Sequence, residues 1–155
     1  MKLKSPDVGK AGELRVRSEL LIRGFSSAVF DQDNGIDIIL SNGKKIQVKT
    51  SMRPSHTPSN YSYKYSFSIR QTQFRNSKGG LYERSYTRKD YSECDYFIFW
   101  CVEDDIFYII PVGKIGGKIS LTIPTPLENR TYRTYKRNHI SKYEQYKNNW
   151  EVLND

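Results

Sequence analysis

The chain has 155 residues, in which 25 lysines and arginines outnumber 17 aspartates and glutamates to give a formal net charge of +8. This length predicts a single domain large enough to bury a hydrophobic core. No apolar stretch approaches the length of a membrane span, and the N-terminal lysines are not followed by the apolar run of a signal peptide. The positive charge favours a polyanionic partner, either nucleic acid or an anionic membrane surface.

The cysteines and histidines give no support to a zinc site. Cys94 and Cys101 lack metal-ligand spacing, and His56 and His139 are isolated in the sequence. We therefore expect two free thiols and a cytoplasmic, reducing environment.

Residues 5–24 predict the first helix, because Pro6 suits a first turn and Gly24 suits a helix end. Its apolar positions form a broad arc that comprises Val8, Ala11, Leu14, Val16, Leu20, Leu21 and Ile22. Glu13 lies at helical spacing from two of these residues. We therefore expect its side chain along a partly apolar face rather than straight into solvent.

Short β segments follow this helix. Residues 28–32 predict one strand. Residues 36–40 and 44–50 predict a hairpin around the Ser-Asn-Gly turn at 41–43, because Asn and Gly tolerate positive φ.

The register of this hairpin decides which side chains share a face. A two-residue loop would put Asp37 on the face opposite to Gln47 and Lys49. A three-residue loop, with Gly43 in the left-handed conformation, would place Asp37 directly opposite Gln47 and on the face that Lys49 shares. We predict the three-residue loop, since the chemistry considered below needs all three side chains together.

The middle of the chain alternates between loops and one strand. Residues 51–60 predict a loop rich in Ser and Pro. Residues 61–69 alternate strictly between apolar and polar side chains, which is typical of a half-buried strand. Residues 70–93 are polar and basic and predict a second long loop.

Two apolar runs, 96–102 and 106–112, predict buried strands in a hairpin, and residues 119–123 predict a further strand. The last helix is expected to begin at Ser141, with Glu144 completing a capping box. Its aromatic side chains would lie on one side: Tyr143, Tyr146 and Trp150.

The predicted hairpin brings together groups that suit phosphodiester hydrolysis. This reaction needs a metal ion, an activated water and positive charge near the developing oxyanion. Asp37 and Gln47 offer the oxygen ligands that Mg²⁺ prefers, and Lys49 offers the cation. Glu13 can add a carboxylate from the packed helix.

These segments resemble a known family. Gly-Glu at 12–13, Gly-Ile-Asp-Ile at 35–38 and Ile-Gln-Val-Lys-Thr at 46–50 resemble the PD-(D/E)XK nuclease superfamily. Within it they are most similar to the homing endonucleases encoded in bacterial group I introns, which also carry Gln in place of the usual acid. Residues 91–97 and 107–112 are similar to that subfamily as well. The resemblance covers residues 5–125.

The resemblance implies a fold, an activity and roles for residues. The fold would be α/β and restriction-endonuclease-like, with a mixed central sheet flanked by helices, although the usual long helix after the Lys49 strand is not evident. The activity would be Mg²⁺-dependent, site-specific cleavage of double-stranded DNA by a homodimer or homotetramer. Asp37 would be the central metal ligand, joined by the side-chain carbonyl of Gln47 and the backbone carbonyl of Val48. Lys49 would orient the attacking water or stabilise the transition state, and Glu13 would hold a metal-bound water or a second metal.

Other interpretations remain open. Archaeal Holliday junction resolvases share the helix and hairpin plan, so a structure-selective nuclease is one alternative. Gln47 is neutral, which weakens metal binding and also permits a non-catalytic DNA-binding module on the same fold. Taken singly, Asp37 and Lys49 are ordinary surface residues, and Glu13 has a simple partner in Arg17, four residues on.

The excess positive charge lies in two segments. Residues 53–93 hold eight basic and three acidic side chains, and residues 130–147 hold six and one. In a single nuclease domain of residues 1–155, we expect the basic loops 51–60 and 70–93 and the basic segment 128–155 to contact phosphates. The candidate DNA-binding residues are Arg53, Lys64, Arg70, Arg75, Lys78, Arg84, Arg88, Arg133, Lys136 and Arg137.

Overall fold

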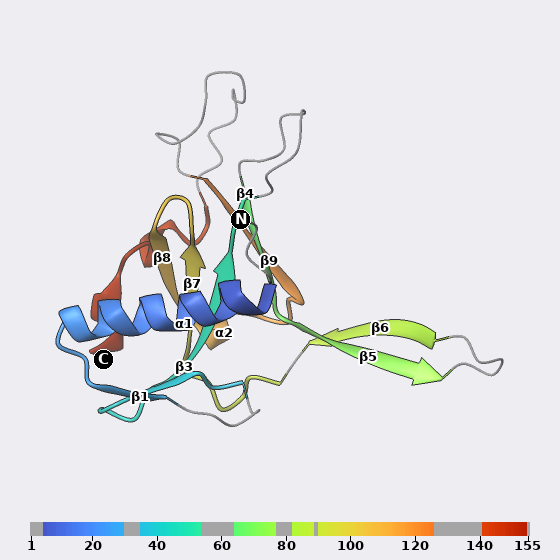
Figure 1. The fold of residues 1–155 in the computed structure, drawn as a ribbon, viewed down its shortest axis with the longest axis horizontal. Coiled ribbons are helices and arrows are strands. Elements are labelled where there is room, and N and C mark those ends of the chain that lie inside the picture. Colours follow the sequence, from blue (N-terminus) through green and yellow to red (C-terminus); the bar gives the residue numbers. More distant parts are fainter. Residues whose placement is uncertain are drawn as a thin grey trace, which may run out of the picture.

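The structure, a computed structural model, describes residues 5–29, 35–53, 64–76, 82–88, 90–125 and 141–154, and for residues 28–29, 71–76 and 82–88 it describes the backbone alone. Its largest unit is a mixed sheet with helix α1 across one face and a small second sheet packed on the other (Figure 1). This arrangement confirms the predicted α/β class with a mixed central sheet. In the described ranges, no helix is long and apolar enough to cross a membrane.

The central sheet has five strands in the order β1-β2-β3-β7-β8. Strands β3 and β7 run parallel, whereas the other neighbouring pairs run antiparallel. The bounds are β1 (Ser27–Val29), β2 (Ile38–Leu40), β3 (Lys45–Ser51), β7 (Tyr96–Cys101) and β8 (Ile106–Pro111). The hairpin and the two buried strands expected from the sequence are confirmed; of the strand expected at 28–32, residues 30–34 lie outside the described residues.

The hairpin between β2 and β3 has the predicted three-residue loop. Ile38 pairs with Ile46, and the Leu40 amide donates to the Lys44 carbonyl over 2.9 Å. Gly43 adopts φ +85°, the left-handed conformation that this loop requires.

Helix α1 (Ser5–Ile22) lies on the face of the sheet that carries Ile46 and Val48. It buries a narrow stripe at four-residue spacing, namely Gly12, Val16 and Leu20. The broad apolar arc expected from the sequence is therefore wrong as a buried surface, because Leu14, Leu21 and Ile22 are 56%, 61% and 76% exposed. The helix ends as predicted, with Gly24 at φ +85°.

The other face of the sheet is covered by β4 (Lys64–Ser68) and β9 (Ser120–Pro124), which pair antiparallel. The alternation predicted for this strand is confirmed: Tyr65, Phe67 and Ile69 are buried against the sheet, and the residues between them are exposed. Residues 61–63 lie outside the described residues. β4 and β9 take the place where the family pattern has a long helix, and the short helix α2 (Val112–Ile115) leads from β8 toward β9.

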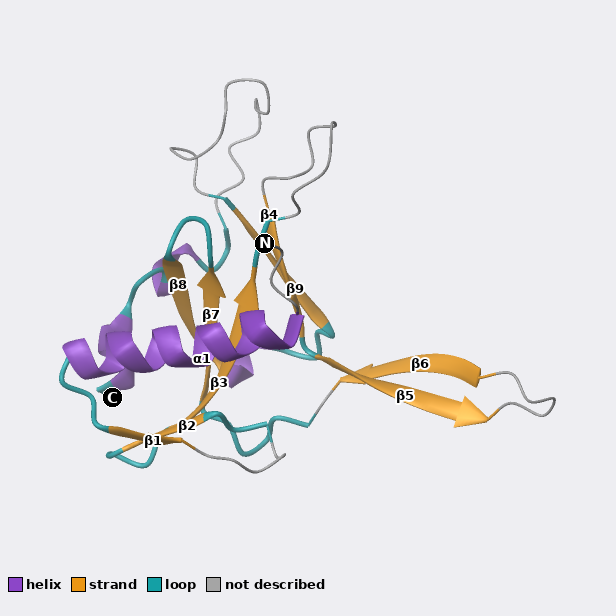
Figure 2. Cartoon of the chain, viewed as in Figure 1, coloured by secondary structure: helices purple, strands orange, loops and turns teal. Residues whose placement is uncertain are grey.

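The segment expected as a basic loop at 70–93 is instead largely a hairpin. β5 (Arg70–Asn76) and β6 (Tyr82–Arg88) pair along their whole length and project away from the body (Figures 1 and 2). Sequence analysis did not predict these strands because neither alternates between apolar and polar residues. The backbone hydrogen bonds that pair the two strands do not depend on that pattern.

The expected C-terminal α-helix is also wrong. The chain forms two short 3-10 helices, η3 (Glu144–Tyr146) and η4 (Trp150–Leu153). Between them Asn148 adopts φ +49°, its amide donates to the Phe107 carbonyl, and its side chain accepts the Phe107 amide. The Asn148 amide thus bonds to the edge of β8, whereas in a continuous helix it would bond to a carbonyl of the preceding turn. Tyr143 and Trp150 consequently pack in different core clusters, on opposite faces of the sheet.

Candidate active site

Asp37 lies where β2 begins to diverge from β3. Its backbone amide still donates to the Ile46 carbonyl, but its carboxylate accepts the Val48 amide over 2.7 Å. The side chain thus supplies the acceptor that a continuing strand would have supplied. This bond ties the position of the carboxylate to the register of the sheet.

The Gln47 side chain completes a small cluster of oxygen-bearing groups. Its amide nitrogen donates both to Asp37 Oδ2 and to the Val48 carbonyl, the latter over 3.2 Å. A carboxylate oxygen and a backbone carbonyl therefore converge on one NH₂ group, and Gln47 is only 7% exposed. Carboxylate, amide and backbone carbonyl oxygens are the ligands that hard divalent cations prefer, so the groups present fit such an ion.

This cluster does not depend on acidic residues alone. In the described part of the chain, no group of three His, Cys, Asp or Glu side chains could hold a metal. Among the described residues, the oxygens that could join Asp37 around a cation are the neutral ones of Gln47 and Val48. This set of three groups is less negative than one built from two acids.

Lys49 shares the face of Asp37 and Gln47, as the register predicts. Its ammonium lies 5.6 Å from the centre of the Tyr91 ring, which is buried and stacks edge-on against Phe97. A cation held over an aromatic face is stabilised by the ring quadrupole. Tyr91 therefore links the site to the core, a role that sequence analysis did not assign to it.

Gly35 brings the backbone before Asp37 close to this ring. It adopts φ +81°, and a Cβ built on it would lie 3.1 Å from Tyr91 ring atoms and 3.4 Å from Gln47 Oε1. Its carbonyl accepts a hydrogen bond from the Cys94 thiol over 3.1 Å. Burial, together with the nearby charge of Asp37, raises the pKa of that thiol to about 11. Cys94 and Cys101 are both buried and free, as predicted.

Glu13 is placed differently from the other predicted residues. Helix α1 covers the face that carries Ile46 and Val48, whereas Gln47 and Lys49 point to the opposite face. Within the described part of the chain, the carboxylate of Glu13 pairs with Lys10 over 2.7 Å, and it does not pair with Arg17. The structure thus brings Asp37, Gln47 and Val48 together but does not join Glu13 to them.

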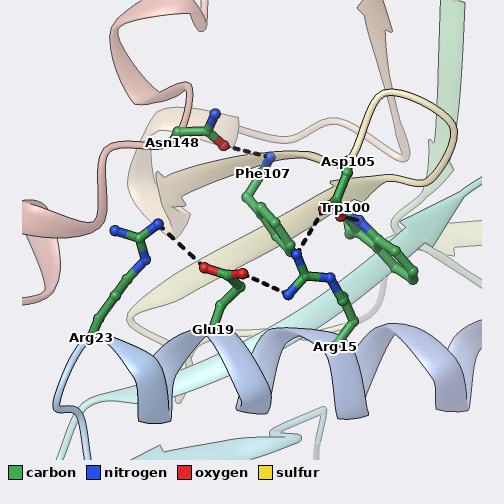
Figure 3. A network of polar contacts seen from close by, with 7 residues as sticks. All are labelled: Arg15, Glu19, Arg23, Trp100, Asp105, Phe107 and Asn148. Carbon is green, nitrogen blue, oxygen red and sulfur yellow. Dashed lines mark hydrogen bonds and ion pairs between the residues drawn. The ribbon is translucent and has the colours of Figure 1, made fainter.

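The position of α1 is fixed by close packing and by charge. A Cβ on Gly12 would lie 1.7 Å from Thr50 Oγ1, so the helix lies directly on β3 beside Lys49. Farther along the helix, Arg15 binds Glu19 over 2.6 Å and Asp105 over 2.7 Å (Figure 3).

Asp105 serves as the acceptor that joins the helix to the sheet. It also accepts the Trp100 indole N–H over 2.8 Å, and Arg15 lies over the Phe107 ring (Figure 3). The hydrogen bond from Arg15 lowers the pKa of Asp105. The network attaches α1 to the turn between β7 and β8, and thereby sets where Glu13 can lie.

The same turn holds the chain that leaves the site. Glu103 accepts the Arg53 amide over 2.9 Å and 3.0 Å, and the Arg53 guanidinium lies 3.7 Å from Asp104. Asp104 also accepts the Tyr65 hydroxyl over 2.7 Å, and burial raises the pKa of Tyr65 well above its ordinary value. Arg53, expected to contact DNA, thus has acidic neighbours that offset its charge.

The remaining candidate DNA-binding residues fall into three groups. Lys64 and Arg70 are exposed on the surface. Three others occupy backbone positions in the β5–β6 ribbon: Arg75, Arg84 and Arg88. The last four lie outside the described residues: Lys78, Arg133, Lys136 and Arg137.

Comparison with known proteins identifies the family of the chain and a solved structure of similar fold. A family model described as PD-(D/E)XK endonuclease matches residues 3–149. Because the match covers nearly the whole chain, the chain belongs to the PD-(D/E)XK endonuclease family. It is therefore a nuclease by family, of a kind that acts on DNA and generally uses divalent metal ions.

Among solved structures, the chain is similar to the bacterial homing endonuclease I-Ssp6803I. The TM-score is 0.68 with 20% sequence identity, over 97% of this chain and 93% of that one. At this identity the likeness establishes a shared fold. No curated protein sequence matches the chain significantly.

The contact between Gly35 and Tyr91 can be tested against a matched glycine. Gly35→Ala should lower the free energy of unfolding more than Gly43→Ala, measured by urea denaturation. Both glycines have positive φ, which costs alanine about 1–2 kcal/mol. A Cβ at Gly43 meets nothing within 4 Å, so the difference isolates the clash with Tyr91. Equal losses would contradict the proposed packing.

Proposed function

We propose that the chain is a Mg²⁺-dependent, site-specific DNA endonuclease whose metal site is formed by Asp37, Gln47 and Val48. The observation that carries this proposal is the convergence of the Asp37 carboxylate and the Val48 carbonyl on the Gln47 amide. A cation of suitable size would satisfy the same two oxygens. The buried free thiols are compatible with the cytoplasmic location that we expect.

Each residue of the cluster has a chemical task in this proposal. The Asp37 carboxylate and the Val48 carbonyl would hold the ion, and Gln47 would turn its amide so that Oε1 replaces the NH₂ group. The bound ion would supply charge to the phosphate and a more acidic water. Lys49, on the same face, would donate to the oxygen that gains negative charge as the phosphodiester bond breaks.

Glu13 remains part of the proposal in a secondary position. It follows Gly12, which packs on Thr50, and Thr50 follows Lys49 on β3. A carboxylate there is close along the chain to the catalytic strand, although its partner in the structure is Lys10. We propose that Glu13 exchanges Lys10 for a metal-bound water when DNA and metal are present.

The first test concerns Lys49. Lys49→Ala should reduce the rate of plasmid or linear duplex cleavage in Mg²⁺ by about 100-fold or more, because one stabilising donor is lost. Its affinity for DNA should change little. Lys44→Ala provides the control, since Lys44 lies on the same hairpin with its ammonium over the Tyr96 ring. Identical cleavage by wild type and Lys49→Ala would favour the alternative of a non-catalytic DNA-binding module.

The second test concerns metal binding without DNA. Gln47→Glu removes the hydrogen bond to Asp37 and places two carboxylates side by side, which raises their repulsion. The variant should melt at a lower temperature than wild type in EDTA and gain more in Tm on addition of Mg²⁺. Asp37→Asn should lose the Mg²⁺ effect. A Gln47→Glu variant with an unchanged response to Mg²⁺ would exclude Gln47 from the metal site.

We also propose that the active form is a homodimer or homotetramer, since cutting both strands requires at least two sites. The exposed side of α1 supports a second copy as its partner, because Leu14 and Leu21 lie two turns apart on one face and are both more than half exposed. Leu21→Lys should shift the chain to monomer in sedimentation velocity. Ile119→Lys, at an exposed apolar residue away from the helix, should not. A wild-type chain that is monomeric would overturn this part of the proposal.

A further inference from the structure

The β5–β6 ribbon is the most prominent surface feature of the molecule. Its strands pair from Arg70 with Arg88 to Asn76 with Tyr82, and in the described part of the chain they form a sheet of their own. The ribbon extends away from the central sheet (Figure 2). A two-stranded ribbon alone gains little stability in water, so contact with a binding partner would stabilise it.

The ribbon has the size and charge of an element that fits DNA. Seven residues per strand span roughly 23 Å at about 3.3 Å per residue. The major groove is about 12 Å wide and admits a two-stranded β-ribbon. The two strands carry four arginines against one glutamate, which complements the charge of the phosphate backbone.

The register divides the ribbon into two chemically different faces. Positions opposite each other share a face, and successive positions alternate. One face carries six residues that can form hydrogen bonds, none of them aromatic: Gln71, Gln73, Arg75, Glu83, Ser85 and Thr87. The other face carries three arginines and three aromatic residues together with Thr72 and Asn76, namely Arg70, Phe74, Tyr82, Arg84, Tyr86 and Arg88.

The first of these faces has the composition of a base-reading surface. Gln pairs with adenine, Arg with guanine, Glu with cytosine, and Ser and Thr with either partner in the major groove. The aromatic residues of the second face would be poor readers of hydrogen-bonding edges. Its arginines suit phosphate contacts, which position a protein without carrying sequence information.

Both ends of the ribbon lead into one core cluster, which contains Ile69 and Tyr91. Ile69, immediately before β5, is buried, and its amide donates to the Ile119 carbonyl over 2.9 Å. After β6, the chain reaches Tyr91, whose ring underlies the Lys49 ammonium. A ribbon seated in a groove would therefore set the position of the catalytic strand relative to the phosphates.

We infer that the β5–β6 ribbon lies in the DNA major groove with the face of Gln71, Gln73, Arg75, Glu83, Ser85 and Thr87 against the base edges, and that this face sets the preferred target sequence. The inference rests on the proposed function, because it assumes a DNA substrate. Arg70, Arg84 and Arg88, on the opposite face, contact phosphates at the sides of the groove.

The test compares base preference with salt dependence. The wild-type chain and its variants are used to select from a pool of randomised linear duplexes in EDTA, so that binding is read without cleavage. Arg75→Ala and Gln73→Ala should each reduce discrimination at one or two adjacent base pairs by about 10- to 100-fold. Arg84→Ala should weaken binding to all duplexes alike and lower the slope of log K against log salt by about 1, with the preferred sequence unchanged.

The outcomes separate this inference from the proposed function. If Arg75→Ala and Gln73→Ala retain the wild-type base preference, the reading face is wrong, even if the wild-type chain cuts DNA. If these variants lose preference but wild type does not cleave in Mg²⁺, the ribbon is supported and the catalytic proposal fails. If the wild-type chain selects no sequence from the pool, the inference is overturned. Unfolding midpoints equal to wild type show that each variant remains folded.

Discussion

The hydrogen bond from the Val48 amide to the Asp37 carboxylate is the constraint on which the site depends. A backbone N–H buried in a sheet must have an acceptor, and here β2 no longer supplies one through its backbone. The Asp37 side chain fills that position and is thereby fixed beside Gln47. A shift of one residue in register would turn Asp37 to the face of α1, and the convergence of oxygens would be lost. The Asp37 carboxylate therefore both completes the hydrogen bonding of β3 and serves as the candidate metal ligand.

Local patterns in the sequence predicted those parts of the fold that local physics determines. The Ser-Asn-Gly turn predicted the hairpin but allowed two registers, and the need to place Asp37, Gln47 and Lys49 on one face selected the three-residue loop that the structure has. The buried strands followed from apolar runs, and β4 from its alternation. The sequence of the β5–β6 ribbon does not alternate between apolar and polar residues, so hydrophobic periodicity could not predict these strands. Residues after Ser141 have the sequence pattern of a helix start, but they form two 3-10 helices and hydrogen-bond to β8 instead. That contact joins distant segments, so the local sequence could not predict it.

The sequence predicted where the candidate site lies but not the contacts that support it. Asp37, Gln47 and Lys49 lie on one face as the register requires, whereas Glu13 pairs with Lys10 on the helix. The acidic turn between β7 and β8 could be read from the sequence only as a break between strands. Its three carboxylates bind partners 39 to 90 residues away, which no local pattern reveals. Tyr91 and Gly35 likewise acquire their roles only when the chain folds.

The ribbon has a consequence for how such a protein can change over time. In the described part of the chain, β5 and β6 hydrogen-bond to each other and to no third strand. The two core clusters are assembled from other elements, as far as the described side chains show. Substitutions in the ribbon would therefore change the free energy of unfolding of the domain only slightly. A lineage could acquire new target preferences there by single mutations while the hairpin that holds Asp37 stays under strict selection.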